Sequence, residues 1–346
     1  MEYLSQHRFP STRYQGSKAK LVDWIWESIR HLEFQSALDV FGGTGCVAYK
    51  LKHQGKTVTY NDVMKWNQLV GKALIENNGT QLDERDVNLL LNTTCRRGTP
   101  TFISSHFKDI YYTHEENAWL DHMVHSVGTL DAPLKQALAW FALFQSCIIK
   151  RPYNLFHRKN LYVRLSEVKR SFGNKTSWDT PFESHFRKFV AEANQAVSTN
   201  HLPNRSISFD ALAIPGQYDL IYVDSPYIAK SGIGVDYQDF YHFLEGLTRY
   251  SEWPQLIDRK SKHLRMIKQP SPWTHRKEIF EAFAVLFERH RDSKIVVSYR
   301  SDGIPSIEEL VVLLKRFKAK VEVLATAGYQ YALSTRRCQE VLLVGT

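Results

Sequence analysis

The sequence has 346 residues, of which 43% are hydrophobic, and this is ordinary for a soluble globular protein with one large domain and an insertion, or with two domains. The formal net charge is +9, from 45 Lys and Arg against 36 Asp and Glu, which favours a polyanionic partner, most simply nucleic acid. The chain has no apolar run of about 18 residues and no apolar stretch near its N-terminus, which argues against a transmembrane helix and a secretory signal, so we expect a cytoplasmic protein that does not bind membranes.

The first eighty residues predict a βαβ unit. Apolar residues recur three and four positions apart after Ser17, which favours a helix with Ser17 as its candidate N-cap. A strand, a glycine-rich turn, a helix and a second strand then follow within about 30 residues, and this order implies a parallel sheet. The expected elements are a helix over 22–32, a strand over 36–41, a helix over 46–55, a strand over 56–62 and a helix over 63–77.

The middle of the chain loses this alternation, and the last part regains it. Residues 83–199 combine a helix-like apolar stretch over 134–150 with an irregular basic tract. A capping box from Ser306 to Glu309 begins the last expected helix. The later elements are expected as strands over 206–212, 218–224, 293–300, 318–327 and 339–345, and as helices over 278–290 and 306–317.

These elements predict an α/β fold. No helix separates the last two strands, so they pair most easily as antiparallel neighbours. We therefore expect a Rossmann-like, mostly parallel sheet with an antiparallel edge strand. Residues 1–84 and 201–346 are expected to form this domain, and residues 85–200 an insertion.

The turn "FGGTGCVA" places Gly43-x-Gly45-x-x-Ala48 between a strand and a helix. Glycines let the backbone come close to a ligand, and a helix N-terminus favours negative charge. Asp62 ends the next strand, where a carboxylate can accept hydrogen bonds from a ribose. The pattern indicates a nucleoside-containing cofactor, and both a dinucleotide and S-adenosylmethionine fit it. The alternative is a purely structural turn.

Several motifs together resemble the Dam-like, D12 class of DNA adenine-N6 methyltransferases. In chain order they are "RYQGSKAKL" (13–21), "DVFGGTG" (39–45), "YND" (60–62), "SFDAL" (208–212), "DSPY" (224–227) and "DYQDFYHFLEGL" (236–247). The resemblance covers roughly residues 10–80 and 205–346. It implies a class I methyltransferase fold, S-adenosylmethionine as cofactor and transfer of a methyl group to N6 of an adenine flipped out of duplex DNA. It also implies that residues 85–200 are a target-recognition insertion.

The stretch "DSPY" carries the expected chemistry. An exocyclic amine is a poor nucleophile, and acceptors for its two N–H bonds favour the pyramidal form that attacks a sulfonium methyl. Asp224 is expected to supply a carboxylate and Ser225 a backbone carbonyl, although the family usually has proline at the latter position. Pro226 stiffens the loop, and Tyr227 offers a face on which the flipped base can stack. By resemblance, Asp224 favours adenine over N4-cytosine; the plain alternative is a strand-end turn.

The resemblance also implies a set of cofactor-binding residues. In the family the lysine of the first motif helps to hold the methionine end of the cofactor, and the acid of "SFDAL" flanks its adenine. Lys18 could instead be a solvated lysine, and Asp62 and Asp210 could be turn caps. The cofactor-binding candidates are Tyr14, Lys18, Asp39, Phe41, Gly43, Gly45, Asp62 and Asp210.

No metal site is expected. The four cysteines lie at least 49 residues apart, which gives no CxxC pair and no zinc signature and favours reduced thiols. His242 and Glu245 have a spacing that occurs by chance in a helix.

Two tracts concentrate the positive charge. Residues 150–188 carry ten Lys and Arg against three acids, and residues 259–277 carry seven and no acid. The first interleaves cations with aromatic residues, so it could bind phosphates, read base edges and fill the gap left by a flipped base. The alternative is an ordinary basic surface. The DNA-binding candidates are Arg151, Asn154, Arg158, Lys159, Arg164, Lys169 and Arg170.

The leading hypothesis is a site-specific DNA adenine-N6 methyltransferase of a restriction–modification system. Double-stranded DNA and a cognate restriction endonuclease are the expected partners, and the protein is expected to be a monomer or weak dimer. The alternatives are N4-cytosine or RNA methylation on the same fold, a nicotinamide-dependent oxidoreductase, and a non-catalytic DNA-binding module.

Overall fold

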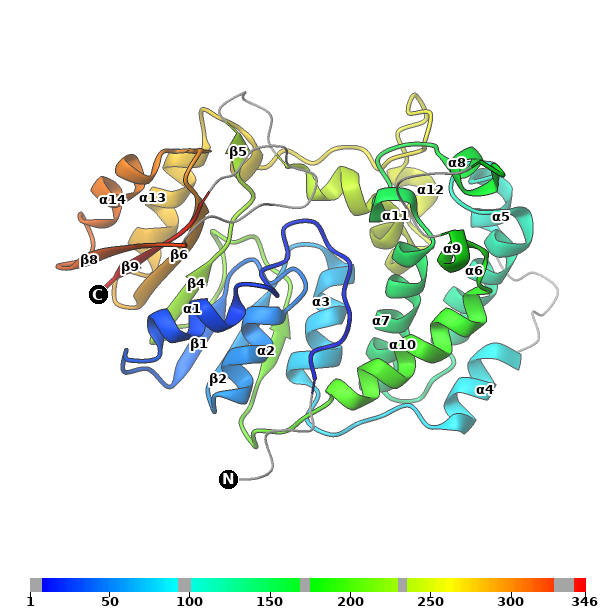
Figure 1. The fold of residues 1–346 in the computed structure, drawn as a ribbon, viewed down its shortest axis with the longest axis horizontal. Coiled ribbons are helices and arrows are strands. Elements are labelled where there is room, and N and C mark those ends of the chain that lie inside the picture. Colours follow the sequence, from blue (N-terminus) through cyan, green and yellow to red (C-terminus); the bar gives the residue numbers. More distant parts are fainter. Residues whose placement is uncertain (1–7, 93–100, 169–174, 230–234, 327–338) are drawn as a thin grey trace. The chain divides into compact units, whose positions relative to one another are not determined.

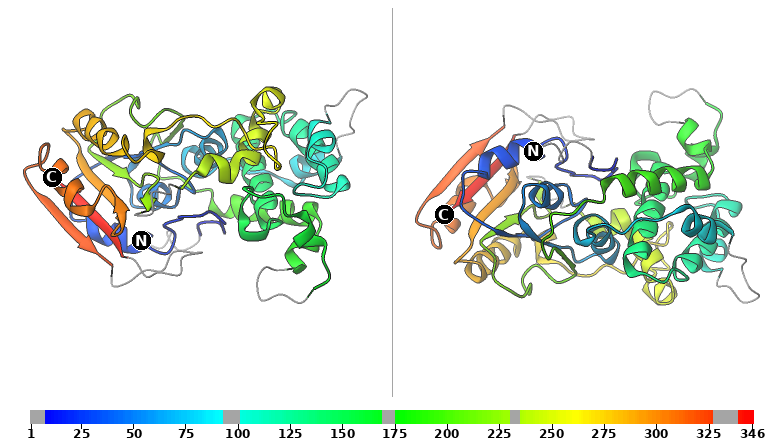
Figure 2. Two further views of the ribbon diagram at one scale, coloured as in Figure 1. Left: turned by 90° about the horizontal axis from the view of Figure 1, so that it is seen from above. Right: turned by 90° about the horizontal axis from the view of Figure 1, so that it is seen from below.

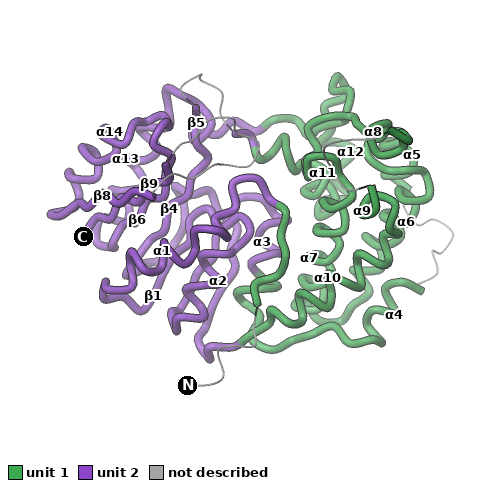
Figure 3. The backbone as a smooth tube through the Cα atoms, viewed as in Figure 1, with its two compact units in different colours: residues 1–13, 72–198, 237–268 green, residues 14–71, 199–236, 269–346 purple. Residues whose placement is uncertain are grey.

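The computed structural model describes residues 8–92, 101–168, 175–229, 235–326 and 339–346. The chain divides into two compact units, each assembled from three stretches of sequence (Figure 3). Unit 1 is residues 1–13, 72–198 and 237–268, and unit 2 is residues 14–71, 199–236 and 269–346. Unit 1 is thus larger than the insertion expected at 85–200. The role of that insertion in target recognition stays a prediction.

Unit 2 contains a seven-stranded sheet among the described residues, in the order β3-β2-β1-β4-β6-β9-β8 (Figures 1 and 2). A separate antiparallel pair joins β5 to β7. The strands are β1 (Ser36–Asp39), β2 (Thr57–Asn61), β3 (Arg205–Ile207), β4 (Leu220–Val223), β5 (Ile228–Ala229), β6 (Lys294–Arg300), β7 (Gly303–Ile304), β8 (Val321–Ala325) and β9 (Glu340–Gly345).

The sheet is mixed and mostly parallel, which agrees with the sequence at this level. β3, β2, β1, β4 and β6 run parallel, whereas β9 is antiparallel to both β6 and β8. The prediction of an antiparallel edge strand was wrong in its position, because the antiparallel strand is β9 and it lies inside the sheet. The reason is burial: all six residues of β9 are buried, and the half-exposed β8 takes the edge.

The helices of unit 2 lie on both faces of the sheet. They are α1 (Val22–Ile29), α2 (Cys46–His53), α3 (Lys65–Gly71), η4 (Pro272–Thr274), α13 (Ile279–Arg289) and α14 (Ile307–Leu314). Leu38 and Val40 pack in one apolar core with α13 and α14. Successive strand residues face opposite sides, so Asp39 faces away from that core.

Two local expectations change in unit 2. α1 begins at Val22 after Leu21, so Ser17 is not its N-cap; the Ser17 Oγ instead accepts the Ala19 N–H at 3.3 Å. The strand expected over 206–212 ends at Ile207, because the Asn61 side chain bonds both the N–H and the carbonyl of Phe209 and turns the chain away. The capping box of Ser306 and Glu309 is confirmed.

Unit 1 is helical in its described part. Its elements are η2, a π-helix (Lys72–Glu76), α4 (Glu84–Asn92), α5 (Phe102–His106), α6 (His114–Val127), α7 (Pro133–Ile149), η3 (Pro152–Asn154), α8 (Leu161–Leu165), α9 (Lys175–Asp179), α10 (Phe182–Ala196), α11 (Tyr237–Thr248) and α12 (Trp253–Leu256). α7 is buried over most of its length, as a helix that is apolar on nearly all sides must be. Aromatic rings also pack together in this unit; the ring centroids of Phe107, Tyr111 and Phe243 lie 5.2–6.0 Å apart.

Within the described ranges, no helix is both long and apolar enough to cross a bilayer. The same residues contain no group of three or more His, Cys, Asp or Glu side chains placed to hold a metal ion.

Candidate active site

Three parallel strands of unit 2 end in polar residues at one edge of the sheet. β1 ends at Asp39, β2 is followed by Asp62 and β4 by Asp224. These strands are neighbours in register, so their carboxyl ends meet at the same edge. Open α/β sheets hold ligands at this edge, and the sequence motifs therefore fall where the fold places a site.

Asp224 is held by a buried lysine. The Lys18 Nζ donates to Asp224 Oδ1 at 2.8 Å, with the lysine side chain 4% and the aspartate side chain 20% exposed. Burial raises the pKa of Asp224, and the charge and hydrogen bond of Lys18 act against that rise. Asp224 is thus anchored through one oxygen while part of its side chain reaches the surface.

Lys18 also contacts a second carboxylate. Its Nζ lies 3.4 Å from Oε1 of Glu340, the first residue of β9, whose side chain is fully buried. The Ser298 Oγ donates to the same Glu340 oxygen. Burial lowers the pKa of Lys18, but Asp224 and Glu340 outweigh it and leave this pKa well above its usual value. The family resemblance placed Lys18 at the methionine end of the cofactor; here it binds two protein carboxylates.

The rest of "DSPY" is tightly placed. Ser225 is 2% exposed, and its Oγ has no hydrogen-bond partner among the described residues. The Tyr227 ring is 7% exposed, and the Arg300 guanidinium carbon lies 4.7 Å from its centroid. One face of this ring is therefore covered by a cation. Pro226, between them, is half-buried.

The glycine turn is fixed by Tyr60 and Asp62. Gly43 has φ +50° and Gly45 φ +77°, values that favour glycine. A Cβ on Gly42 would lie 2.0 Å from the Tyr60 ring, so no side chain fits there. The Tyr60 hydroxyl donates to the Gly43 carbonyl at 2.7 Å. The turn is thus locked against β2 by side chains of that strand.

Asp62 makes several local bonds. Its Oδ2 accepts from the Gly43 N–H and from Asn67 Nδ2, both at 3.0 Å, and its Oδ1 accepts from the Met64 N–H at 2.9 Å. Asp62 therefore caps the turn that precedes α3 and ties that turn to the glycine turn. Both interpretations of the sequence, cap and ribose ligand, involve the same carboxylate, and the structure shows the first.

Asp39 is the least satisfied carboxylate of the group. It is 1% exposed, and its Oδ1 has no hydrogen-bond partner in the part of the chain that the structure describes. Burial, and then the negative charges of Asp224 and Asp62, raise its pKa well above the usual range. A cationic ligand beside the turn would relieve this repulsion and favour the ionised form of Asp39.

The other cofactor candidates surround the turn less closely. Tyr14 is half-buried, with its ring 3.4 Å from the position of a Cβ on Gly43. The Phe41 ring packs edge-on against the Trp273 ring, with 4.9 Å between the ring centroids. Asp210 is exposed, and its Oδ1 accepts the Leu212 N–H at 2.8 Å, as in a local turn.

The DNA-binding candidates of unit 1 separate into buried and exposed residues. Arg151 and Arg164 are 1% and 3% exposed. Arg151 donates to three backbone carbonyls and to Asn160, and Arg164 binds both oxygens of Glu116. Both guanidiniums thus bind protein groups in the interior, and DNA binding by Arg151 and Arg164 stays a prediction.

The exposed candidates are fewer. Arg158 and Lys159 are exposed, and Asn154 is half-buried with φ +60°. Lys169 and Arg170 lie outside the described residues. The tract thus retains two adjacent exposed cations among the candidates that the structure describes.

Sequence reasoning missed Glu340, Ser298 and Arg300. Each lies on a strand whose other residues are mostly apolar, and an acid at the start of "EVLLVG" was the available signal. Their partners are far away in the sequence, so spacing could not reveal them.

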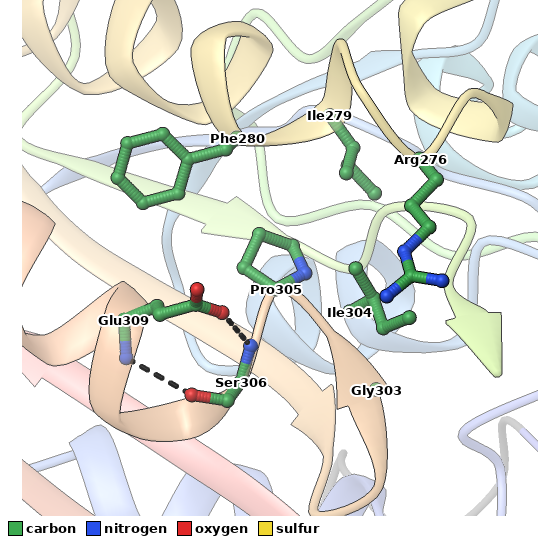
Figure 4. Close-up of a pocket in the computed structure, with 8 residues that line it drawn as sticks. All are labelled: Arg276, Ile279, Phe280, Gly303, Ile304, Pro305, Ser306 and Glu309. Atoms are coloured by element: carbon green, nitrogen blue, oxygen red, sulfur yellow. Dashed lines mark hydrogen bonds between the residues drawn. The ribbon is translucent and has the colours of Figure 1, made fainter. Parts of the chain in front are cut away.

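A separate pocket of about 530 Å³ lies between the start of α13 and the β7–α14 connection (Figure 4). Its lining residues are Arg276, Ile279, Phe280, Gly303, Ile304, Pro305, Ser306 and Glu309. None of the candidate catalytic or cofactor residues lines it.

Comparison with known proteins shows which family has a similar sequence. The sequence profile of the D12 class N6 adenine-specific DNA methyltransferases matches residues 14–312. The chain is 28% identical to type II methyltransferase M2.HphI of Haemophilus parahaemolyticus, over 93% of each chain. It is 24% identical to modification methylase LlaI of Lactococcus lactis subsp. lactis over 96% of this chain and 54% of the relative, and 24% identical to type II methyltransferase M.FokI of Planomicrobium okeanokoites over 88% and 46%. The chain thus spans about half the length of the last two.

Proposed function

The chain belongs to the D12 class of N6 adenine-specific DNA methyltransferases, and from this premise we propose that it methylates adenine at a specific site in duplex DNA, with S-adenosylmethionine as donor and the target base flipped out of the helix. The class makes it an adenine-specific DNA methyltransferase. The donor, the roles of individual residues and the flipped base are our proposal.

The observation that carries the proposal is the Asp224 carboxylate. Oδ1 is bonded to Lys18, and the side chain remains 20% exposed. In our proposal Oδ2 accepts one N–H of the target amine and the Ser225 backbone carbonyl accepts the other. Two acceptors placed in advance favour the pyramidal amine and the positive charge that develops on it. The flipped base would stack on the Tyr227 face opposite Arg300.

The residues around the glycine turn fit S-adenosylmethionine. Asp39 lies buried near the negative charges of Asp62 and Asp224, and its Oδ1, which has no partner among the described residues, is an open acceptor for a cationic ligand. When bound, the cofactor supplies an electrophilic methyl group on a sulfonium. We propose that Asp62 meets the ribose while it holds the turn. Tyr14, Phe41 and Asp210 would line the adenosine.

The same negative site argues against the oxidoreductase alternative. A dinucleotide would bring its pyrophosphate to the glycine turn, and carboxylates there would repel it. S-adenosylmethionine carries no phosphate and has two cationic groups.

For DNA we propose backbone contacts by two exposed basic surfaces of unit 1. The first is Arg158 with Lys159. The second is the hairpin closed by the bridge of Ile257 to Met266, on which Arg259, Lys260 and Lys262 are exposed. Cations on these surfaces would neutralise phosphates.

The relatives suggest the biological setting. Their names describe type II methyltransferases and modification methylases. We propose that this chain likewise serves a restriction–modification system and protects sites from a cognate endonuclease.

Sequencing that detects modified bases, applied to DNA from cells that express the chain, tests the proposal. We expect N6-methyladenine at one recurrent sequence, and none with Asp224→Ala. N4-methylcytosine instead would assign the other base. Calorimetric titration with S-adenosylmethionine and, separately, with NAD tests the cofactor, and binding of NAD alone would overturn this assignment.

A further inference from the structure

Glu340 is a buried acid in an apolar strand. It begins β9, where the following residues are Val, Leu, Leu, Val and Gly, and its side chain is fully buried. β9 pairs with β6, which carries its hydrogen-bond partner Ser298. A lone ionised carboxylate is costly in such a place, so its partners decide what it does.

Glu340 and Asp224 share one cation. Lys18 Nζ lies 2.8 Å from Asp224 Oδ1 and 3.4 Å from Glu340 Oε1. Burial and then the Asp224 charge raise the pKa of Glu340, while Lys18 acts in the opposite direction. Two carboxylates around one lysine contribute little to the stability of the fold. Even a balanced buried ion pair can often be replaced by apolar residues without loss of stability. A need for stability therefore does not account for Glu340.

The geometry indicates instead that Glu340 restricts the position of the Lys18 side chain. Lysine is a flexible four-carbon stem with three donors, and a single contact leaves it free to move. Contacts to Asp224 and Glu340 fix Nζ between β4 and β9. Because Nζ then occupies Asp224 Oδ1, the target amine is left with Oδ2.

We propose that Glu340 is a positioning residue for methyl transfer, which holds Lys18 in place and through it orients the Asp224 carboxylate toward the target amine. The inference rests on the catalytic role proposed for Asp224. Glu340 itself touches neither base nor cofactor in this proposal.

Replacement of Glu340 by glutamine tests it. Glu340→Gln keeps the shape and the Ser298 contact but removes the charge that holds Lys18. We expect kcat to fall about 10- to 100-fold, as when the partner that orients a metal-ligating histidine is removed. KM for DNA and the Kd of S-adenosylmethionine should stay within about twofold. Glu322→Gln on the neighbouring strand β8, where the glutamate is half-buried and pairs with Lys320, is the matched control.

The pH profile separates positioning from a structural role. Lys18 lowers the pKa of Asp224, so a lysine released by Glu340→Gln should let that pKa rise, and the acidic limb of kcat should move to higher pH, as in Lys18→Met. A merely structural residue would lower the whole profile without moving that limb. The titratable and charged groups around Asp224 that must be unchanged in the comparison are Lys18, Asp39, Cys46, Tyr222, Tyr227 and Arg300.

A double-mutant cycle shows whether Glu340 acts through Lys18. Single-turnover rates should fall no further when Glu340→Gln is added to Lys18→Met, since the residue to be positioned is already gone. Additive losses would overturn the proposal, as would an unchanged kcat in Glu340→Gln. If Glu340→Gln does not fold, Ser298→Ala replaces it and must show a smaller loss of kcat with unchanged KM. A wild-type chain that does not methylate DNA would instead refute the proposed function.

Discussion

Each unit of the protein contains a buried ion cluster, and the two clusters have opposite composition. The acidic cluster of unit 2 is Asp224 and Glu340 around Lys18. The basic cluster of unit 1 is Lys150 and Arg164 around Glu116, at 3.0 and 2.7 Å. The acidic cluster has a surplus of negative charge, and the basic cluster has a surplus of positive charge.

The surroundings of the two clusters also differ in which buried polar atoms have no partner among the described residues. In the basic cluster, Lys150 donates to the carbonyls of Trp178 and Thr180, and Arg164 to those of Tyr111 and Trp178. The Arg164 Nε, a donor, has no partner in the described part of the chain. Beside the acidic cluster, Asp39 Oδ1 and Ser225 Oγ have no partner within the described ranges. The difference teaches that a basic tract in the sequence can serve the interior, whereas the carboxylate surplus lies beside open acceptors at the candidate site.

The two clusters respond to acid in opposite directions. Burial raises the pKa of Glu116, but Arg164 and Lys150 outweigh burial and lower it, so the stability that Glu116 contributes is present above its unfolded pKa and is lost as the pH falls through the folded value. The pKa values of Asp224 and Glu340 are raised by burial. Their contribution is most favourable below the unfolded pKa and declines as the pH rises toward the folded values.

The largest effect is expected from the acidic cluster. Asp224→Ala should reduce methylation by at least about 10²- to 10³-fold, since it removes a preorganised acceptor for the target amine. The Kd of S-adenosylmethionine should change little. Single-turnover assays and calorimetry measure the two quantities, with Asp292→Ala, an exposed aspartate of the same unit, as control. Turnover near wild type would remove Asp224 from the chemistry.

The basic cluster should affect stability instead. Glu116→Gln leaves two buried cations without a counter-charge and should lower the free energy of unfolding by about 3 kcal/mol, at the low end of the usual range because Glu116 is 16% exposed. Denaturant titration measures this, with the exposed neighbour Glu115→Gln as control. A loss confined to methylation, with stability unchanged, would contradict the contrast between the clusters.

Lys18 offers a test by pH. Lys18 lowers the pKa of Asp224, so Lys18→Met should move the acidic limb of the single-turnover rate upward by about one to three pH units. The exposed Lys20→Met should leave the limb in place. A limb that does not move in Lys18→Met would show that Asp224 is not the group that titrates in it.

The smallest effect is expected at the surface of unit 1. Arg158→Ala combined with Lys159→Ala should reduce the slope of log K against log salt by about 1.8, because each phosphate that a cation no longer neutralises accounts for about 0.9. Fluorescence anisotropy on cognate and scrambled duplexes at several salt concentrations measures it. A greater loss of affinity on the cognate duplex would add base reading to phosphate binding. The control is Lys315→Ala combined with Arg316→Ala, at an exposed pair of unit 2. An equal change of the slope in the control would show that Arg158 and Lys159 have no special role in DNA binding.

Sequence alone predicted the parts of the site that follow from local rules. Glycine turns and strand-end acids have fixed places in a parallel sheet, so Asp39, Asp62 and Asp224 come together as expected. Burial of a charge depends on partners that no local pattern reveals. Arg151 and Arg164 were therefore predicted on the surface, where basic residues usually lie.

The position of β9 shows the same limit in the fold. The absence of a helix between the last two strands predicted their antiparallel pairing, which is confirmed. It could not show that β9 enters between β6 and β8, because that depends on which strand removes more apolar surface from water.

The position of β9 in the sheet also determines when unit 2 can complete its fold during synthesis on the ribosome. Lys18 leaves the exit tunnel early and Asp224 much later, but the sheet between β6 and β8 stays open until residues 340–345 emerge. A nascent chain arrested before that point lacks both an interior strand of the sheet and the second anchor of Lys18. Unit 2 is therefore expected to complete its sheet only once residues 340–345 have left the exit tunnel.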